Sequence, residues 1–422
     1  RVTMGELFRL PTICKLAGHI RVSEKEEFHP LKPVEKKDYY LLSAAQRQLY
    51  LIYRLEPQST GYNMPISIEL EGTYDRGKIQ ELFRQLICRH ESLRTSFHLM
   101  DAEAVQRIHE EVDFQVENYK FQIPNYKQIP NPKSQIKNKE SLVCQGRGEV
   151  SSPIIDSFIR PFDLARAPLI RVGIVEAGQS VRLMVDMHHI ISDARSLEII
   201  EEEFTRLSVG ESLSPLKVQY KDFAQWQYNQ QSGKMRDQEN YWTQQFSTSV
   251  PIPVLEIPTD FPRPGIKGYE GSSLVFMLEK ELAGKLVNLA RQENLTIFMV
   301  LLAIYYIFLY KLSGQEDIIV GTNTAGRPNP DLDPIIGYFI GTLALRNYPQ
   351  PGKPFKQFLR EVGNRTLEAF DNQEYPFDEL VNKVVKRRDP SRSPLFDVLF
   401  SFNPQVVKAV TLEDDENRQA KF

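Results

Sequence analysis

The chain of 422 residues has few cysteines and no strong charge of either sign. Its three cysteines, Cys14, Cys88 and Cys144, are far apart and form no C-x-x-C pair, which argues against a disulfide framework and a zinc cluster. The net charge of −3 gives no overall attraction to nucleic acid or to an anionic membrane. We therefore expect neither as a partner. Because the cysteines indicate no disulfide framework, we expect a location in the reducing cytoplasm.

Long apolar runs and internal repeats are also missing. The longest apolar run, residues 297–310, has 14 residues, whereas about 20 are needed to cross a bilayer, so it predicts a buried helix. The first residues lack the basic start and apolar core of a secretion signal. Because the sequence begins at Arg1, we expect an excised piece of a longer chain. No period of 20 to 50 residues is visible, which disfavours a repeat solenoid.

What the chain does contain is an ordinary globular composition, with 41% hydrophobic and 25% charged residues. At 422 residues the chain is longer than one compact hydrophobic core usually accommodates, which predicts two lobes. Strands interspersed with helices in both halves predict an α/β fold built from α+β layers. We place a linker at 21–37, a first lobe at 38–214 and a second lobe at 215–422. Residues 119–150, rich in Pro, Asn, Gln and Lys, predict an exposed insertion.

The most informative feature is the adjacent pair His188 and His189. Residues 181–187 carry apolar side chains at every odd position, which is typical of a half-buried strand. A helical pattern follows the pair, with Ser192 or Asp193 as its N-cap. Two imidazoles at a strand-to-helix turn, with a carboxylate four residues beyond the second, suit acid–base chemistry near neutral pH. Because neighbouring side chains on a strand end point to opposite sides, we expect no metal site there.

Seven short segments, in this order along the chain, carry a family resemblance. They are Ser43–Tyr50, Arg89–Phe97, Met187–Ser196, Tyr220–Trp226, Ile336–Arg346, Asn372–Asp378 and Arg388–Asp397. Together they resemble the motifs of the condensation domain of nonribosomal peptide synthetases, a member of the chloramphenicol-acetyltransferase-like superfamily. The third segment resembles the family's His-His-x-x-x-Asp-Gly motif. The resemblance implies two chloramphenicol-acetyltransferase-like lobes in a V-shaped pseudo-dimer, with a tunnel between them.

The first twenty residues carry a second resemblance. Residues 4–20 look like the closing helix of a peptidyl carrier protein. This resemblance implies a carrier immediately upstream, so that residues 1–20 are its C-terminal helix and the chain is an internal part of a multidomain megasynthase.

The family resemblance implies an amide-forming acyltransferase of antibiotic biosynthesis and secondary metabolism. In such a domain, the amine of a downstream aminoacyl thioester attacks the carbonyl of an upstream acyl or peptidyl thioester. The expected partners are upstream and downstream peptidyl carrier proteins and an adjacent adenylation domain. The carriers deliver 4′-phosphopantetheine arms, while the domain itself holds no cofactor. As a fragment it is expected to be monomeric.

The resemblance also implies roles for four residues of the site. His189 is the candidate for the chemistry, either as general base or by positioning the amine, and the sequence leaves both open. His188 turns inward and supports the turn. Asp193 pairs with Arg346 of the second lobe and is structural.

Three further positions, Ser192, Ala194 and Gly341, are expected to border the substrate. Two of them depart from the family pattern, because Ala194 stands where the motif has glycine and Gly341 where a later motif has asparagine. A side chain at Ala194 would crowd the thioester, or cost about 1 kcal/mol if its φ is positive.

Two other functions remain open. An epimerisation domain shares the fold and the histidine motif and also follows a carrier, although its tyrosine-rich motifs are missing here. A catalytically silent module that only recruits carriers or tailoring enzymes is the other alternative, and Ala194 leaves room for it. A dipeptidyl thioester product, α-proton exchange, or binding alone would separate the three.

Overall fold

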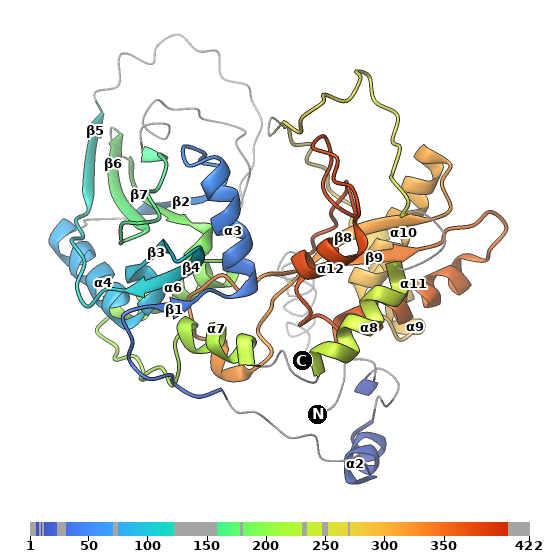
Figure 1. Ribbon diagram of the computed structural model, residues 1–422, viewed down its shortest axis with the longest axis horizontal. Coiled ribbons are helices and arrows are strands. Elements are labelled where there is room, and N and C mark those ends of the chain that lie inside the picture. Colours follow the sequence, from blue (N-terminus) through green and yellow to red (C-terminus); the bar gives the residue numbers. More distant parts are fainter. Residues whose placement is uncertain are drawn as a thin grey trace, which may run out of the picture. The chain divides into compact units, whose positions relative to one another are not determined.

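The computed structural model describes residues 6–7, 10, 12–22, 31–70, 75–121, 158–177, 180–229, 234–246, 252–268 and 271–403 (Figure 1). The chain forms two compact units. The N-terminal unit consists of Pro30–Gln230 together with Arg327–Phe339. The C-terminal unit consists of Gln231–Gly326 and Ile340–Phe422, together with Arg1–His29. Both units combine helices with strands, which confirms the predicted mixed fold.

Two sheets form the framework of the N-terminal unit. One has the strand order β2-β7-β6-β5, antiparallel except for the parallel pair of β5 and β6, and the other has the antiparallel order β1-β4-β3. The strands are β1 (Tyr40–Leu41), β2 (Asn63–Leu70), β3 (Thr95–Met100), β4 (Glu103–Ile108), β5 (Glu117–Phe121), β6 (Ile170–Ala177) and β7 (Ser180–His188).

Among the described residues, helices and short 3₁₀ turns complete this unit. Ser43 and Gln46 form a reciprocal capping box at the start of α3, and α4 and α6 pack against each other (Figure 1). Apolar side chains of these elements share one core with β6 and β7. The elements are α3 (Ala44–Leu55), α4 (Arg76–Arg89), η1 (Glu91–Arg94), η2 (His189–Ile191), α6 (Ala194–Ser208), α7 (Tyr220–Asn229) and η4 (Pro330–Leu332).

The C-terminal unit packs helices on an antiparallel strand pair, and the N-terminal segment contributes one further helix, α2. Helix α10 is the predicted apolar helix: Thr296 caps its start, and Gly314 ends it in the left-handed region with φ 70°. No single described helix is long and apolar enough to span a membrane, although α9 and α10, bent by 108°, reach that composition together. The elements are α2 (Ile13–Val22), α8 (Lys234–Phe246), α9 (Lys280–Gln292), α10 (Ile297–Ser313), β8 (Ile318–Thr324), β9 (Gly341–Asn347), α11 (Phe355–Asp371) and α12 (Phe377–Val384).

The unit boundaries differ from the predicted lobes 38–214 and 215–422. Helix α7 belongs to the N-terminal unit, because its Tyr220 and Phe223 pack with Leu31 and with Phe339 of the returning segment. That segment, Arg327–Phe339, lies between β8 and β9 in sequence but is part of the N-terminal unit. A sequence boundary drawn once along the chain cannot represent such a return.

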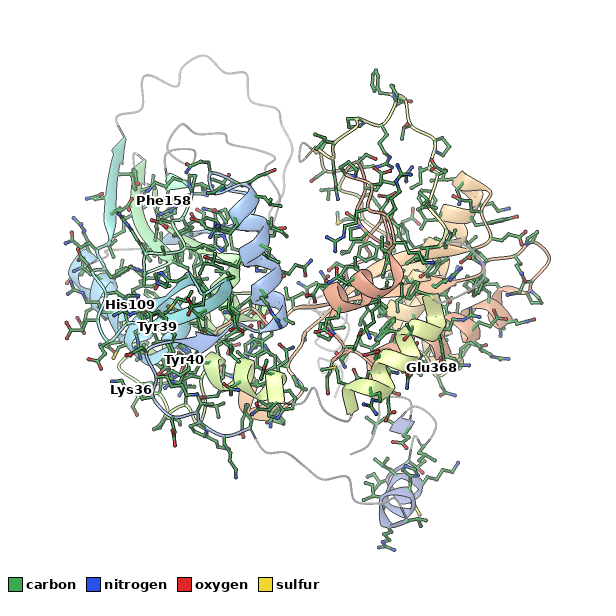
Figure 2. The ribbon with its side chains drawn as sticks, viewed as in Figure 1. Lys36, Tyr39, Tyr40, His109, Phe158 and Glu368 are labelled. Atoms are coloured by element: carbon green, nitrogen blue, oxygen red, sulfur yellow. The ribbon has the colours of Figure 1, made fainter. Side chains whose placement is uncertain are left out.

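The predicted linker 21–37 ends earlier than expected. Leu31 is buried, and the peptide N–H of Val34 donates to a carboxylate oxygen of Asp222 at 2.8 Å. Lys36, labelled in Figure 2, forms an ion pair with Glu110. Residues 31–37 are therefore packed against the N-terminal unit.

One smaller prediction also changes. Strand β5 occupies the first residues of the predicted insertion 119–150, because it pairs in parallel with β6. Residues 122–150 lie outside the described residues.

Candidate functional site

Strand β7 ends at His188 between two neighbouring strands. Asn63 of β2 lies opposite His188 in the register. The peptide N–H of His188 donates to the carbonyl oxygen of Leu169 at 3.1 Å, and that of His189 donates to the carbonyl oxygen of Tyr62 at 2.8 Å. The two histidine backbones are thus fixed from opposite sides of the strand.

His188 faces the interior and is only 4% exposed. Its ring lies 6.5 Å from that of Tyr62 and 6.2 Å from that of Phe162, measured between centroids. Its Nδ1 accepts a hydrogen bond from the peptide N–H of Ile190 at 3.1 Å. Burial, helped by the neighbouring imidazole of His189, lowers the pKa of His188 to about 3. His188 is therefore neutral at neutral pH, and its ring nitrogen holds the turn.

His189 is partly exposed, and one of its ring nitrogens is engaged. Nδ1 lies 2.7 Å from the carbonyl oxygen of Ser192. Because a carbonyl oxygen only accepts, Nδ1 of the neutral ring carries the proton and Nε2 presents a lone pair. Within the described part of the chain, no hydrogen bond engages Nε2. This arrangement leaves Nε2 ready to accept a proton or a hydrogen bond.

Ser192 braces the turn from inside. Its side chain is fully buried, and its Oγ donates to the carbonyl oxygen of His188 at 3.1 Å. Its own carbonyl orients His189. The prediction that Ser192 borders the substrate does not fit this burial, because an enclosed and bonded hydroxyl offers no surface to a ligand.

Asp193, one of the two residues predicted as N-cap, caps α6 and accepts the peptide N–H of Ser196 at 2.8 Å. Its carboxylate also accepts from Nη2 of Arg327, at 3.1 and 3.2 Å to the two oxygens. The peptide N–H of Phe339 donates to the same carboxylate at 3.3 Å. Burial lowers the pKa of Arg327, and the Asp193 carboxylate opposes this. The ion pair is enclosed, with both side chains at most 5% exposed.

The prediction that Asp193 pairs with Arg346 is wrong. Arg346 donates to the carboxylate of Asp317 instead, from Nε at 2.8 Å and from Nη2 at 2.6 Å. Both of these residues lie in the C-terminal unit, at the ends of β8 and β9. Arg327 is the residue that enters the N-terminal unit at the start of the returning segment, and the sequence reasoning missed this role.

A second buried carboxylate precedes the histidines. Asp186 shares its strand face with His188 and accepts from Nδ2 of Asn63 at 2.7 Å and from Nη1 of Arg171 at 3.0 Å. Burial raises the pKa of Asp186 to about 6 in spite of these donors. The Arg171 guanidinium lies 3.6 Å over the ring of Phe162, which in turn contacts His188.

Among the residues that the structure describes, no group of three His, Cys, Asp or Glu side chains is arranged to hold a metal ion. The two cysteines within them, Cys14 and Cys88, are free and exposed.

The strand-to-helix turn with its two histidines and capping aspartate can now be compared with known proteins. The family model of the condensation domain matches residues 36–422. This chain belongs to the condensation-domain family. The match confirms the resemblance inferred from the seven segments.

Relatives of this condensation domain include antibiotic synthases. It is 42% identical over 426 residues to one of the plipastatin synthase proteins of Bacillus subtilis (strain 168), covering 100% of this chain and 16% of that protein. It is 42% identical over 401 residues to bacitracin synthase 2 of Bacillus licheniformis, covering 94% and 14% respectively. Tyrocidine synthase 3 of Brevibacillus parabrevis is 42% identical over 409 residues, covering 96% and 6%. The chain therefore spans about a sixth of these relatives, or less.

Solved structures share the fold of this condensation domain. A four-domain nonribosomal peptide synthetase, AB3403, matches with a TM-score of 0.75 and 23% identity, over 90% of this chain and 27% of that one. The X-domain of teicoplanin biosynthesis, in complex with OxyB, matches with a TM-score of 0.74 and 19% identity, over 89% and 80%. At these identities the likeness concerns the fold alone.

Ala194, which replaces the motif's glycine, is unstrained in this condensation domain. It is the first residue of α6, is exposed, and is not among the described residues with positive φ. The cost of about 1 kcal/mol that a positive φ would bring therefore does not arise.

Gly341, the other departure, begins β9 in the C-terminal unit opposite Thr324. A Cβ at this position would lie 2.6 Å from Oγ1 of Thr324, so the glycine permits the close strand pairing. This packing explains the residue without a ligand.

Proposed function

We propose that this condensation domain forms peptide bonds in nonribosomal peptide synthesis. The α-amine of a downstream aminoacyl thioester attacks the carbonyl carbon of an upstream acyl or peptidyl thioester. A C–N bond forms and the C–S bond breaks. The amine loses one proton and the departing sulfur gains one, so the products are an amide and a thiol. Membership of the condensation-domain family and 42% identity to three antibiotic synthases support this reaction.

The observation that carries the proposal is the 2.7 Å contact between Nδ1 of His189 and the carbonyl oxygen of Ser192. The Nδ1–H of His189 donates to this carbonyl, which directs the Nε2 lone pair away from the turn. Such a nitrogen accepts the proton of the attacking amine as a general base, or accepts a hydrogen bond that orients the amine. Because thioesters are already activated, orientation alone contributes a large part of the acceleration.

The partners follow from the same proposal. Peptidyl carrier proteins upstream and downstream present their acyl groups on 4′-phosphopantetheine arms, and an adenylation domain adjoins the condensation domain. Residues 1–20 are the closing helix of the upstream carrier. In support, identity to the plipastatin synthase protein covers the whole chain, including residues before the family match, and α2 (Ile13–Val22) has no buried residue. We further propose a monomeric domain in the cytoplasm.

The test uses an upstream and a downstream carrier loaded with labelled aminoacyl-pantetheine. The expected product with the wild-type domain is a dipeptidyl thioester on the downstream carrier, detected by mass spectrometry. His189→Ala is expected to lower its rate by about 10²-fold or more, as is usual for loss of a general acid–base group. His109→Ala is the matched control, because His109 is another partly buried histidine of the same unit, bonded to Ser96.

The other functions give different outcomes in this assay. Exchange of the α-proton with solvent without a dipeptide would identify an epimerisation domain. Carrier binding without either reaction would identify a recruitment module. Equal rates for wild type and His189→Ala would remove His189 from the mechanism.

A further inference from the structure

One aromatic side chain from the returning segment Arg327–Phe339 contacts the candidate imidazole. The rings of Tyr338 and His189 lie edge to face, with centroids 4.9 Å apart and planes inclined by 68°. The hydrogen bond from Nδ1 to Ser192 acts within the plane of the imidazole. The Tyr338 ring adds a second, differently directed contact, and two such contacts together restrict both side-chain torsions of His189.

The backbone of Tyr338 is itself held in place. The hydroxyl of Tyr220 donates to the carbonyl oxygen of Tyr338 and is 2.7 Å from Oγ of Ser43. Tyr220 is 2% exposed, so this support is part of the core. Its ring occupies the space beside Gly337, where a Cβ would lie only 1.9 Å from Cδ2 of Tyr220. Glycine at 337 is therefore required for Tyr220 to reach the carbonyl of the next residue.

The neighbours of Tyr338 fix the segment on both sides. Ser92 Oγ donates to the carbonyl oxygen of Ile336 at 2.6 Å. The peptide N–H of Gly337 donates to Oγ of Ser196 at 3.1 Å, and that of Phe339 donates to Asp193. Residues 336–339 are thus anchored at each position, and the ring that they place against His189 is that of Tyr338.

We propose that Tyr338 is a positioning residue that fixes the orientation of the His189 imidazole for reaction, an inference that rests on the function proposed for His189. The aromatic ring, and not the hydroxyl, makes the contact. Burial raises the pKa of Tyr338 to about 12, so the phenol is uncharged at neutral pH. A reacting nitrogen that is displaced slightly from its productive geometry loses rate while substrate binding is retained.

The kinetic test compares Tyr338→Leu and Tyr338→Met with Tyr338→Phe in the dipeptide assay. Leucine and methionine fill the space without a ring and are expected to lower kcat about 3- to 10-fold, with KM for the acceptor unchanged within about twofold. Phenylalanine keeps the ring and is expected to restore kcat. Tyr53→Leu is the matched control, since Tyr53 packs on the same core. An equal loss in Tyr338→Phe, or in Tyr53→Leu, would overturn the proposal.

A second readout does not depend on catalysis. In protein labelled with ¹³C in its seven histidine rings, the C–H signals of His189 are assigned through His189→Gln. The ring current of residue 338 is expected to change the chemical shifts of these signals in wild type and in Tyr338→Phe. This change is expected to be absent in Tyr338→Leu. Unchanged signals in Tyr338→Leu would refute the contact. An inactive wild type with the expected shifts would instead reject the proposed function while leaving the contact intact.

Discussion

Two aspartate–arginine pairs, one from each unit, lie near strand ends and differ in their surroundings. Asp193 and Arg327 are both at most 5% exposed, and Arg327 also donates to the carbonyl oxygens of Leu332 and Ile335. In the other pair Arg346 is 4% exposed, but the side chain of Asp317 is 28% exposed. The Asp193–Arg327 pair is sealed, that is, enclosed and out of contact with water, whereas water reaches the Asp317 carboxylate of the second pair.

The difference shows how much a residue can depend on a distant segment. Asp193 and Arg327 are 134 residues apart in sequence, and their contact brings the returning segment against the histidine turn. Asp317 and Arg346 adjoin the neighbouring strands β8 and β9, so their contact only completes a local pairing. Loss of one partner should therefore have consequences of different size in the two units.

The largest effect is expected when the sealed pair is broken. Arg327→Ala leaves the Asp193 carboxylate buried without its cation, and we expect a loss of about 3–5 kcal/mol in the free energy of unfolding. Urea denaturation measures it. Arg327→Lys should recover only part of the loss, because one ammonium cannot serve the carboxylate and both carbonyl oxygens. A loss below about 1 kcal/mol for Arg327→Ala would remove the contrast between the pairs.

Acidification tests the sealed region through His188. Its folded pKa of about 3 lies below the ordinary value of 6.5. As the pH falls through this window, the unfolded chain binds a proton that the folded chain does not, so the stabilisation is complete above pH 6.5 and decreases toward pH 3. Between pH 7 and pH 4 we expect His188 to contribute roughly 3 kcal/mol to the loss of stability.

The measurement is the urea midpoint between pH 7 and pH 4 in wild type and His188→Asn, whose amide oxygen replaces Nδ1 as acceptor. The variant should show a weaker loss on acidification. Asp186 acts in the opposite direction, because its folded pKa of about 6 exceeds the ordinary 3.8 and its contribution is lost as the pH rises through 6. Asp186 is present in both proteins, so the difference between them isolates His188. Parallel pH curves would contradict the burial of His188.

A smaller loss is expected from overpacking beside the sealed pair. Gly337→Ala forces a methyl group into the ring of Tyr220, and we expect a cost of about 1–3 kcal/mol in thermal or urea unfolding. In the double variant, adding Tyr220→Leu to Gly337→Ala should recover part of the lost stability, because leucine lacks the ring that the methyl group meets. Gly284→Ala, on the exposed side of α9 with no atom within 4 Å of the added group, is the control and should stabilise by about 0.5–1 kcal/mol. Equal effects at 337 and 284 would contradict the close approach.

Breaking the half-open pair should cost less. Arg346→Ala removes two donors from Asp317 and one from the carbonyl oxygen of Gln245. Because water reaches the Asp317 carboxylate, we expect the free energy of unfolding, measured by urea denaturation, to fall by about 1–2 kcal/mol. A loss as large as that of Arg327→Ala would show that exposure of one partner does not distinguish the two pairs.

The smallest change is expected at the exposed edge of the turn. Ala194→Gly restores the residue of the family motif but places glycine in the first turn of α6, and we expect a loss of up to about 1 kcal/mol. Stabilisation by this substitution, measured as a rise in the urea midpoint, would indicate strain at Ala194 after all.

The local parts of the site could be predicted from the sequence. Alternating apolar residues before His188 predicted the strand that the structure shows as β7. The polar residues Ser192 and Asp193 before a helical pattern predicted an N-cap, and Asp193 takes this position. Both follow from interactions within a few residues. The order of seven motifs identified the family, and no long-range contact had to be known for it.

The remaining features depend on contacts between distant residues. Arg327 and Arg346 are both basic residues of the second half, and their sequence gives no sign that only one returns to the N-terminal unit. The fit of Tyr220 beside Gly337 likewise joins positions more than a hundred residues apart. For the linker, Leu31 and Val34 were a signal among charged neighbours, but the buried site that they enter, beside α7, was not visible.

The placement of Arg327–Phe339 has a practical meaning for engineered synthetases. A chimera joined after residue 230 would take this segment from one parent and the histidine turn, Ser92 and Tyr220 from the other. Residues 327–339 of one parent would then have to pack against residues 30–230 of the other parent. Chimeras that take residues 327–339 from the same parent as residues 30–230 keep these contacts. Their additional crossover points therefore lie just before residue 327 and just after residue 339.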